Sequence, residues 1–267
     1  MNTDRSISLA LRLYILIMFI FIFTPIIASF VFSFNSDRFP SIPLGSFSLK
    51  WYATVIARPE VWEAAKTSIL VAISSAVLST FLGFCTAYTD FRYNFMFKPA
   101  YLALALLPPT IPLIIMALAM LSWLAQIGLS GQVTSIVIAH TVLGTPFAMA
   151  IIRLRLNDMD PSLEAAAWNL GASEWRGMWE IVIPFAKPSI TAALCLTAAV
   201  SFDEFAVAWF VSGLNKTIPV VILEILQGNV DPQINAIGTF VFVISMTLVV
   251  IAQTLIMSKG KQEDATS

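Results

Sequence analysis

Charge is scarce in this chain. Charged residues make up 12% of its 267 positions, and the 15 Lys and Arg nearly balance the 16 Asp and Glu. Soluble domains carry about 25% charged residues, so the composition excludes an ordinary soluble fold. A formal net charge of −1 offers no basic surface for nucleic acid. Hydrophobic residues, at 58%, indicate instead a protein that lies in membrane lipid.

Metal-binding and catalytic side chains are equally few. The chain has two cysteines, Cys85 and Cys195, and a single histidine, His140. Both cysteines fall in apolar runs, which argues against a structural disulfide. His140 has no second ligand-type residue near it in sequence, so we expect no metal site and a hydrogen-bonded packing role. No stretch reads GxxxxGK[ST] and no nucleophile–base pair is evident, so we expect no catalytic residue, no ATP site and no cofactor.

Long apolar runs dominate what remains. Four runs without charge cover 13–36, 67–89, 99–152 and 232–258, and a fifth, 188–211, contains only two carboxylates. A helix needs about 20 apolar residues to cross a bilayer, so 99–152 holds two spans. The alternation typical of strands is absent from these runs. We predict an all-α protein, a single transmembrane domain over 1–267, with six spans at 11–34, 66–89, 99–124, 134–154, 188–211 and 235–257.

Basic residues set the expected orientation. If the N-terminus is cytoplasmic, ten of the 15 Lys and Arg lie inside and five outside. This bias favours both termini in the cytoplasm, and it also places the polar loop 155–187 there. A secretory signal is the competing interpretation of the N-terminus. Its apolar core would span about 7–15 residues, whereas the run 13–34 is longer, so an uncleaved first span is preferred.

The first external segment, 35–65, is rich in aromatic residues and punctuated by prolines. Two compatible interpretations apply to it. The aromatic residues are typical of a belt at the membrane interface. The segment is also suited to form part of a platform for an external solute-binding protein.

The loop 155–187 is the most informative part of the chain. Within it, residues 160–184 read DPSLEAAAWNLGASEWRGMWEIVIP. Asp160 can cap a helix whose first position is Pro161, where the missing N–H costs nothing. Gly171 stands where a left-handed residue would end that helix, and Ser173 and Glu174 suit the start of a second. A charged insert with such well-defined ends, between segments fit for lipid, predicts a docking element.

The same residues resemble the EAA signature of ABC-importer permease subunits. The resemblance is carried by the Glu-Ala-Ala run, by Gly171 and by the closing Ile-Val-Ile-Pro. Counting back from Gly171, the family's glutamate falls on Ala165 and its alanines on Ala166 and Ala167, so Glu164 stands one place early. The resemblance implies that this loop docks into a cleft of a separate ATPase. Small alanines would allow close approach, and Glu164 would offer a charge to a partner's base.

Prolines interrupt two of the predicted spans. Pro108, Pro109 and Pro112 cluster in the third, and Pro146 lies in the fourth. Each removes a backbone hydrogen bond and tends to kink its helix. Irregular backbone at membrane depth survives only inside protein or beside a wet cavity. We therefore expect Pro108 and Pro112 to lie near a translocation path, with simple packing kinks as the alternative.

Asp203 and Glu204 are the charges in the fifth predicted span. A carboxylate in the bilayer costs at least ~2.5–3.5 kcal/mol, so such residues usually face a partner or a water-filled path. Adjacent helix positions point about 100° apart, so the two cannot face one spot. We place both carboxylates and Trp209 beside the path, with Asp203 attracting a cationic solute and Glu204 in the more structural role. An interhelical hydrogen-bonded pair is the alternative.

The fifth span sharpens the resemblance. Residues 201–205 (SFDEF), 210–213 (FVSG) and 217–219 (TIP) resemble the corresponding region of spermidine/putrescine permeases. This implies a type I importer permease fold in a bacterial inner membrane. It also implies two ATP-binding subunits, a second and non-identical permease subunit, and an extracytoplasmic solute-binding protein. A polyamine is the expected solute, with opines, phosphonates and amino-acid-like compounds as alternatives.

A carrier driven by an ion gradient is the alternative from another class. In such a carrier, Asp203 or Glu204 would be the proton or sodium site. Carriers of this kind are often built from inverted repeats, and no such symmetry is evident between the two halves of the sequence. The carrier interpretation also leaves the polar loop 155–187 without a purpose, so the importer is preferred.

Overall fold

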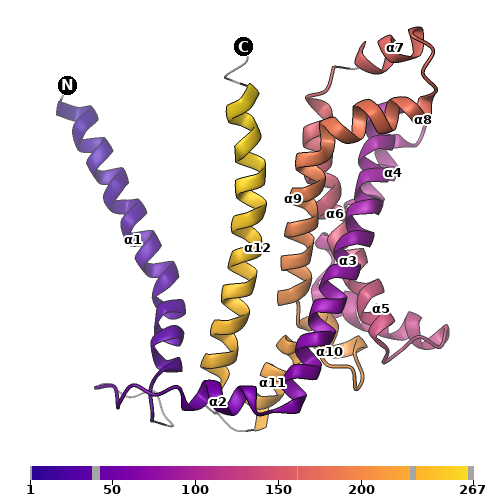
Figure 1. Cartoon of the computed structure of the whole chain (residues 1–267). Coiled ribbons are helices and arrows are strands. Elements are labelled where there is room, and N and C mark those ends of the chain that lie inside the picture. Colours follow the sequence, from indigo (N-terminus) through magenta and orange to yellow (C-terminus); the bar gives the residue numbers. More distant parts are fainter. Residues whose placement is uncertain (1, 38–42, 161, 229–232, 264–267) are drawn as a thin grey trace. The chain divides into compact units, whose positions relative to one another are not determined.

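The computed structural model describes residues 2–37, 43–160, 162–228 and 233–263. These residues are helical apart from turns, connecting segments and an isolated antiparallel bridge between Asn35 and Phe47, which confirms the all-α prediction. The elements, labelled in Figure 1, are α1 (Asn2–Ser33), α2 (Lys50–Ile56), α3 (Pro59–Arg92), α4 (Lys98–Ala105), η1 (Pro108–Thr110), α5 (Leu113–Gln126), α6 (Val133–Asn157), α7 (Ser162–Asn169), α8 (Glu174–Gly177), η2 (Met178–Val182), α9 (Ile183–Asp203), α10 (Ala206–Val211), α11 (Ile218–Gly228) and α12 (Gln233–Glu263).

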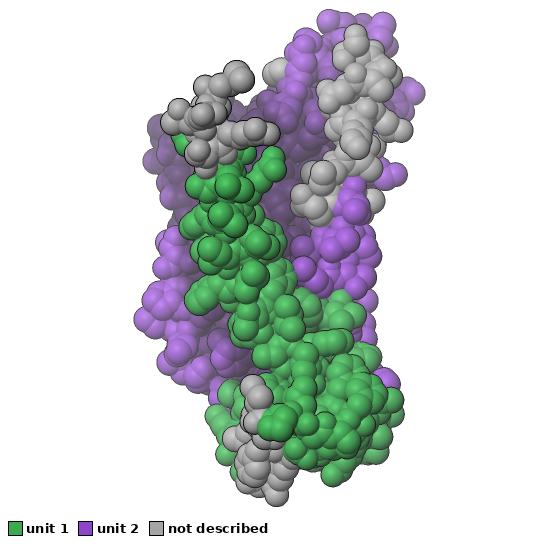
Figure 2. Space-filling view, turned by 90° about the vertical axis from the view of Figure 1, so that its left-hand side faces the viewer, with its two compact units in different colours: residues 1–61, 222–243 green, residues 62–221, 244–267 purple. Residues whose placement is uncertain are grey.

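The chain divides into two compact units, and each is built from two separate stretches (Figure 2). Unit 1 comprises residues 1–61 and 222–243, and unit 2 comprises 62–221 and 244–267. In unit 1, the indole N–H of buried Trp51 on α2 donates to the carbonyl of Asn35 at 2.7 Å. At least one aromatic residue of the segment 35–65 therefore stabilises that segment's own fold.

Unit 2 is organised around α6. Its sequence is apolar on most of its surface, as suits a helix covered on several sides, and it lies against α5, α9 and α10. Two clusters of buried apolar side chains meet it. One joins α5, α6 and α10 through residues such as Leu124, Ile136 and Val211. The other joins α3, α6 and α9 through residues such as Ala87 and Met149.

Glycines allow α3 and α6 to approach closely. A Cβ atom added to Gly83 on α3 would lie 2.7 Å from the Cβ of Ala148 and 2.7 Å from the backbone nitrogen of Met149, both on α6. A Cβ added to Gly144 on α6 would lie 2.5 Å from the hydroxyl of Ser79 on α3. Membrane helices associate largely through such small residues, because lipid offers no hydrophobic drive for packing. This close pair forms the scaffold that carries the sites described below.

The predicted third span, 99–124, is wrong as a single helix. The structure breaks it into α4, η1 and α5. Pro108 and Pro112 lack the N–H that a continuous helix needs, and Ile111, which precedes a proline, is extended with φ −84° and ψ 131°. Within the described residues, five helices are long and apolar enough to cross a membrane: Ile7–Ser33, Pro59–Arg92, Val133–Asn157, Glu174–Asp203 and Gln233–Ile251. They correspond to the other five predicted spans.

The predicted fifth span, 188–211, also needs correction. Helix α9 ends at Asp203, and the separate helix α10 begins at Ala206. At the other end, α9 begins at Ile183 and is continuous with α8 through the π-helical turn η2. The predicted loop 155–187 is therefore shorter than expected. At its start, α6 continues to Asn157, and at its end the chain is helical from Glu174 onward. Helix α11 was not predicted.

Candidate functional site

Helix α7 and the turn after it form a compact hairpin with α8. The Asp160 carboxylate accepts a hydrogen bond from the backbone N–H of Ser162 at 2.9 Å. The bonds from Ser162 hold the pKa of Asp160 below its usual value, so this cap persists at neutral pH and is lost only in acid. The predicted first position of the helix, Pro161, lies outside the described residues. The start of α7 thus forms locally, as its sequence predicts.

The end of α7 is a left-handed turn at Gly171, whose φ is +88°. The N–H of Gly171 donates to the carbonyl of Trp168 at 2.9 Å, and the N–H of Ala172 donates to the carbonyl of Ala167 at 3.0 Å. These two bonds satisfy helix carbonyls that would otherwise lack partners. Ser173 then begins α8 by accepting from the N–H of Arg176 at 3.2 Å. The predicted roles of Gly171 and Ser173 in shaping the two helices are confirmed.

Glu164 points into the chain, with only 2% of its surface exposed. The Tyr88 hydroxyl donates to its Oε1 at 3.1 Å, and Nε of Arg92 lies 3.8 Å from its Oε2. Both partners belong to the last turns of α3. Because these contacts use the carboxylate internally, the expectation that Glu164 offers its charge to a partner does not fit its position. Ala165 and Ala166, the next two residues, are exposed.

Arg92 holds the hairpin at three points, and we call these contacts the Arg92 clamp. Besides Glu164, its guanidinium lies over the Trp168 ring at 4.4 Å from the centroid. Its terminal nitrogen also lies 4.0 Å from the Glu174 carboxylate. One side chain at the end of α3 therefore contacts both α7 and α8. Sequence reasoning missed Tyr88 and Arg92, and their only local signal is a spacing of four residues, which places them on one helix face.

The outer surface of the hairpin carries large apolar side chains as well as the exposed charges of Glu174, Arg176 and Glu180. Leu170 is 89% exposed and stands next to the turn. Trp175 and Trp179 on α8 and η2 are also exposed, and their rings pack edge to face with centroids 6.0 Å apart. Exposed apolar side chains gathered in this way are typical of a surface that another protein covers. The hairpin thus has an inner face bound to α3 and an outer face available for contact.

The carboxylate of Glu204 caps helix α10. It accepts hydrogen bonds from the backbone N–H of Val207 at 3.0 Å and of Ala208 at 3.1 Å. The backbone of Glu204 is extended, with φ −71° and ψ 121°, and this break separates α10 from α9. A negative charge at a helix N-terminus satisfies free N–H groups and interacts favourably with the helix dipole. The break in the predicted fifth span is therefore stabilised by Glu204 itself.

His140 connects Glu204 to a chain of hydroxyl groups. Its Nε2 lies 3.4 Å from the Glu204 carboxylate, and its Nδ1 lies 2.8 Å from the hydroxyl of Ser201. Ser201 in turn is 2.9 Å from the hydroxyl of Ser75 on α3. His140 is buried in α6, so these contacts link α3, α6, α9 and α10. This arrangement matches the hydrogen-bonded packing role expected for His140.

Asp203 differs from its neighbour in exposure and partners. It lies at the last position of α9, is exposed in this chain and accepts a hydrogen bond from the Ser245 hydroxyl on α12 at 2.8 Å. The ring of Trp209 is partly buried, because its side chain packs against the apolar cluster of α5, α6 and α10. Of the three residues predicted together, Asp203 is exposed, whereas Glu204 and Trp209 are partly buried.

The prolines of the predicted path lie in the connection between α4 and α5. Pro108 begins η1, and Pro112, with φ −53° and ψ 128°, precedes α5. Both are at least partly exposed, and neither belongs to the buried core of unit 2. Pro146, in contrast, is buried inside α6. Pro146 is therefore packed inside a helix, whereas Pro108 and Pro112 belong to the irregular segment between α4 and α5.

Helices long enough to cross a membrane, together with a hairpin held against the end of one of them, are the arrangement expected of a permease subunit of an ABC importer. The family described as "Binding-protein-dependent transport system inner membrane component" matches residues 75–259. The chain is 31% identical to the spermidine/putrescine permease PotC of Escherichia coli K12 over 90% of its own length and 91% of PotC. It is 27% identical to the putrescine permease PotI of the same organism, over 82% and 81% of the two chains.

The fold agrees with a solved importer. A bacterial ABC transporter for the import of alginate superposes with a TM-score of 0.75 at 17% identity, over 96% of each chain. The chain belongs to the family of binding-protein-dependent inner-membrane transport components. It is therefore a multi-pass inner-membrane protein and a transport subunit, and the ion-coupled carrier alternative is set aside.

Proposed function

We propose that residues 1–267 form a single transmembrane permease domain, which helps form the path for a polyamine or a similar small cation. The similarity to PotC along nine-tenths of the chain carries this proposal. Asp203 supports it chemically, because a carboxylate that is exposed at the end of α9 suits a cationic solute. Pro108 and Pro112 would line the irregular part of the same path, whereas Glu204 and Trp209 would shape it from behind.

The working importer would contain two ATP-binding subunits, a second and non-identical permease, and an external solute-binding protein. The α7–α8 hairpin would dock into the ATPase through its outer face, with Ala165, Ala166, Ala167 and Gly171 allowing close approach. Glu164 would contribute from inside, by fixing the hairpin to α3. Closure of the ATPases on ATP would then move the hairpin and switch access to the path.

Uptake by the complete importer in vesicles tests the solute class. We expect spermidine or putrescine, delivered by the solute-binding protein, to be accumulated and to stimulate ATP hydrolysis. Sulfate serves as the anionic control and is expected to do neither. Calorimetry of the solute-binding protein with polyamines, opines and phosphonates would identify the ligand independently. Transport of an anion without any transport of polyamine would contradict the proposal.

Neutralising the two carboxylates separates their roles. Asp203→Asn is expected to reduce polyamine uptake about five- to tenfold, the scale of one lost charge contact. Glu204→Gln removes a charge from the α10 cap, so it should lower the thermal stability of the chain more than Asp203→Asn does. Uptake and the melting temperature would be measured on the same preparations. Unchanged uptake by Asp203→Asn would return Asp203 to a purely structural role.

Thiol labelling tests the orientation with both termini in the cytoplasm. The native Cys85 and Cys195 are first replaced by alanine to give a background free of cysteine. A cysteine at Ser130, between α5 and α6, should then react with an impermeant reagent from outside the cell. A cysteine at Asn169, at the end of α7, should react only from inside, and it leaves the Ser173 cap intact. Labelling of both positions from one side would overturn the orientation.

A further inference from the structure

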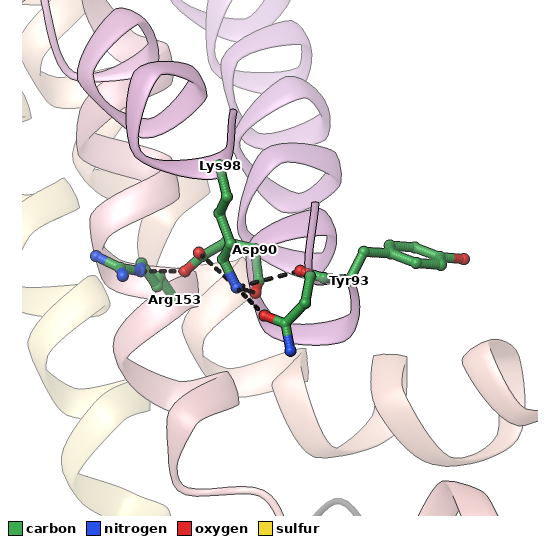
Figure 3. A network of polar contacts seen from close by, with 5 residues as sticks. Asp90, Tyr93, Lys98 and Arg153 are labelled. Atoms are coloured by element: carbon green, nitrogen blue, oxygen red, sulfur yellow. Dashed lines mark hydrogen bonds and ion pairs between the residues drawn. The ribbon is translucent and has the colours of Figure 1, made fainter. Parts of the chain in front are cut away.

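A second polar cluster lies where α3 passes into α4. Asp90, near the end of α3, is only 5% exposed. Its carboxylate accepts a hydrogen bond from Nε of Arg153 on α6 and lies 3.3 Å from Nζ of Lys98, the first residue of α4 (Figure 3). Lys98 also donates to the carbonyl of Tyr93 at 3.2 Å. A buried carboxylate thus ties α3, α4 and α6 together.

The cluster has more positive than negative charge. Two cations share the single carboxylate of Asp90, so one positive charge is left over. The side chain of Arg153 is 38% exposed and that of Lys98 is 24% exposed. Figure 3 shows the two terminal nitrogens of Arg153 on the side away from Asp90. Within the described part of the chain, Arg153 bonds to Asp90 through Nε, which leaves those terminal donors for another acceptor.

An open cleft of about 480 Å³ adjoins this surplus charge. Its lining is mixed in character. The polar part consists of Asp90, Lys98, Arg153 and Asn157, and the apolar part of Phe91, Pro99 and Leu102. The residues come from the ends of membrane-crossing helices, α3 and α6, and from the start of α4. A ligand for this cleft would combine a single negative charge with an apolar body, at the level where a helix leaves the bilayer.

We propose that the cleft binds an anionic phospholipid. The phosphodiester group would accept hydrogen bonds from the terminal guanidinium nitrogens of Arg153, whose planar fork matches a phosphate, and from the amide of Asn157. The first carbons of the acyl chains would lie against Leu102, Pro99 and Phe91. A lipid with one net negative charge balances the surplus of the cluster, whereas a zwitterionic lipid brings a cation into contact with Arg153 and Lys98. A polyamine is excluded by the same repulsion.

Lipid binding to the complete importer in nanodiscs tests the proposal. Native mass spectrometry would compare retention of phosphatidylglycerol with that of phosphatidylcholine. Asn157→Asp places a carboxylate in the cleft and leaves the contacts of Asp90 intact. It should reduce the preference for phosphatidylglycerol about fivefold, the effect of one charge near a membrane surface. Asn157→Ala, the matched control, removes the amide without adding charge and should retain most of the preference.

A second variant and a competition with inorganic phosphate complete the test of lipid binding. Arg153→Gln removes the guanidinium and the surplus positive charge, and it leaves the buried Asp90 carboxylate paired with Lys98. It should also weaken retention, and it replaces Asn157→Asp if that variant does not fold. Millimolar inorganic phosphate should not displace the lipid, and displacement would identify an anion site rather than a lipid site. Equal retention of the two lipids by the unaltered protein would overturn the proposal. An Asn157→Asp protein with undiminished preference would do the same.

Discussion

Arg92→Ala is expected to abolish coupled transport while leaving membrane insertion intact. The substitution removes all three contacts of the Arg92 clamp, those with Glu164, Trp168 and Glu174. Glu164 would remain buried with Tyr88 as its hydrogen-bond partner, and removing one member of a buried ion pair costs about 3–5 kcal/mol. Because the Arg92 side chain is 27% exposed, we expect the lower part of that range. The hairpin would then detach from α3 for much of the time.

Hydrogen exchange over residues 162–177 would measure that detachment, and polyamine uptake in vesicles would measure its effect. We expect faster exchange in the hairpin and at least a tenfold loss of uptake. Arg176→Ala is the matched control, because it breaks the exposed pair with Glu180 on the same hairpin, and such a pair contributes about 0.3–0.5 kcal/mol. Arg92→Leu combined with Glu164→Gln should recover part of the activity. Normal exchange and uptake in Arg92→Ala would show that the clamp is dispensable.

Gly171→Trp is expected to have the second largest effect. With φ at +88°, any residue other than glycine is strained there by about 1–2 kcal/mol. The space around Gly171 is open within this chain, with nothing within 4 Å of an added Cβ, so the first atom of a side chain would not clash. The indole would project beside Leu170 from the face proposed to meet the ATPase. We expect correctly inserted protein that fails to hold the ATPase and transports at least tenfold less.

Gly171→Ala separates the two causes of this effect. It carries the backbone strain without the bulk, so it should lower stability slightly and retain most of its uptake. Co-purification of the ATPase subunits and uptake would be compared across the two variants. Equal losses in Gly171→Ala and Gly171→Trp would assign the whole effect to strain in the hairpin and remove the evidence for docking at this turn.

Local signals made most of the hairpin predictable. A cap at Asp160, a left-handed Gly171 and a second cap at Ser173 each depend on residues within one turn of the chain. The burial of Glu164 could not be derived in this way. It depends on Tyr88 and Arg92, which are brought to it by the packing of α3 and leave no trace in the sequence of the loop. The result is that a charge expected to face a partner faces the chain's own helix.

The predicted spans also show which features can be derived from local sequence and which cannot. Hydropathy located α1, α3, α6 and α12, because a count of apolar residues is enough to detect a continuous helix. It failed at 99–124 and 188–211, where proline or a capping carboxylate ends a helix within an apolar run. In the second case the charge at Glu204 was visible in the sequence, but its bonds to the N–H groups of Val207 and Ala208 were not. A carboxylate in an apolar run can mark the start of a helix as well as a solute path.

The π-helical turn η2 has a consequence for how the chain tolerates change. From Glu174 to Asp203 the backbone is helical without a loop, so α8 and α9 belong to one continuous stretch of 30 helical residues, which bends between them (Figure 1). The five-residue turn at Met178–Val182 determines how far α9 is rotated about the helix axis relative to α8. Removing a single residue there would turn every side chain of α9 by about 100° relative to the hairpin. Substitutions in η2 should therefore be tolerated far better than a change in its length.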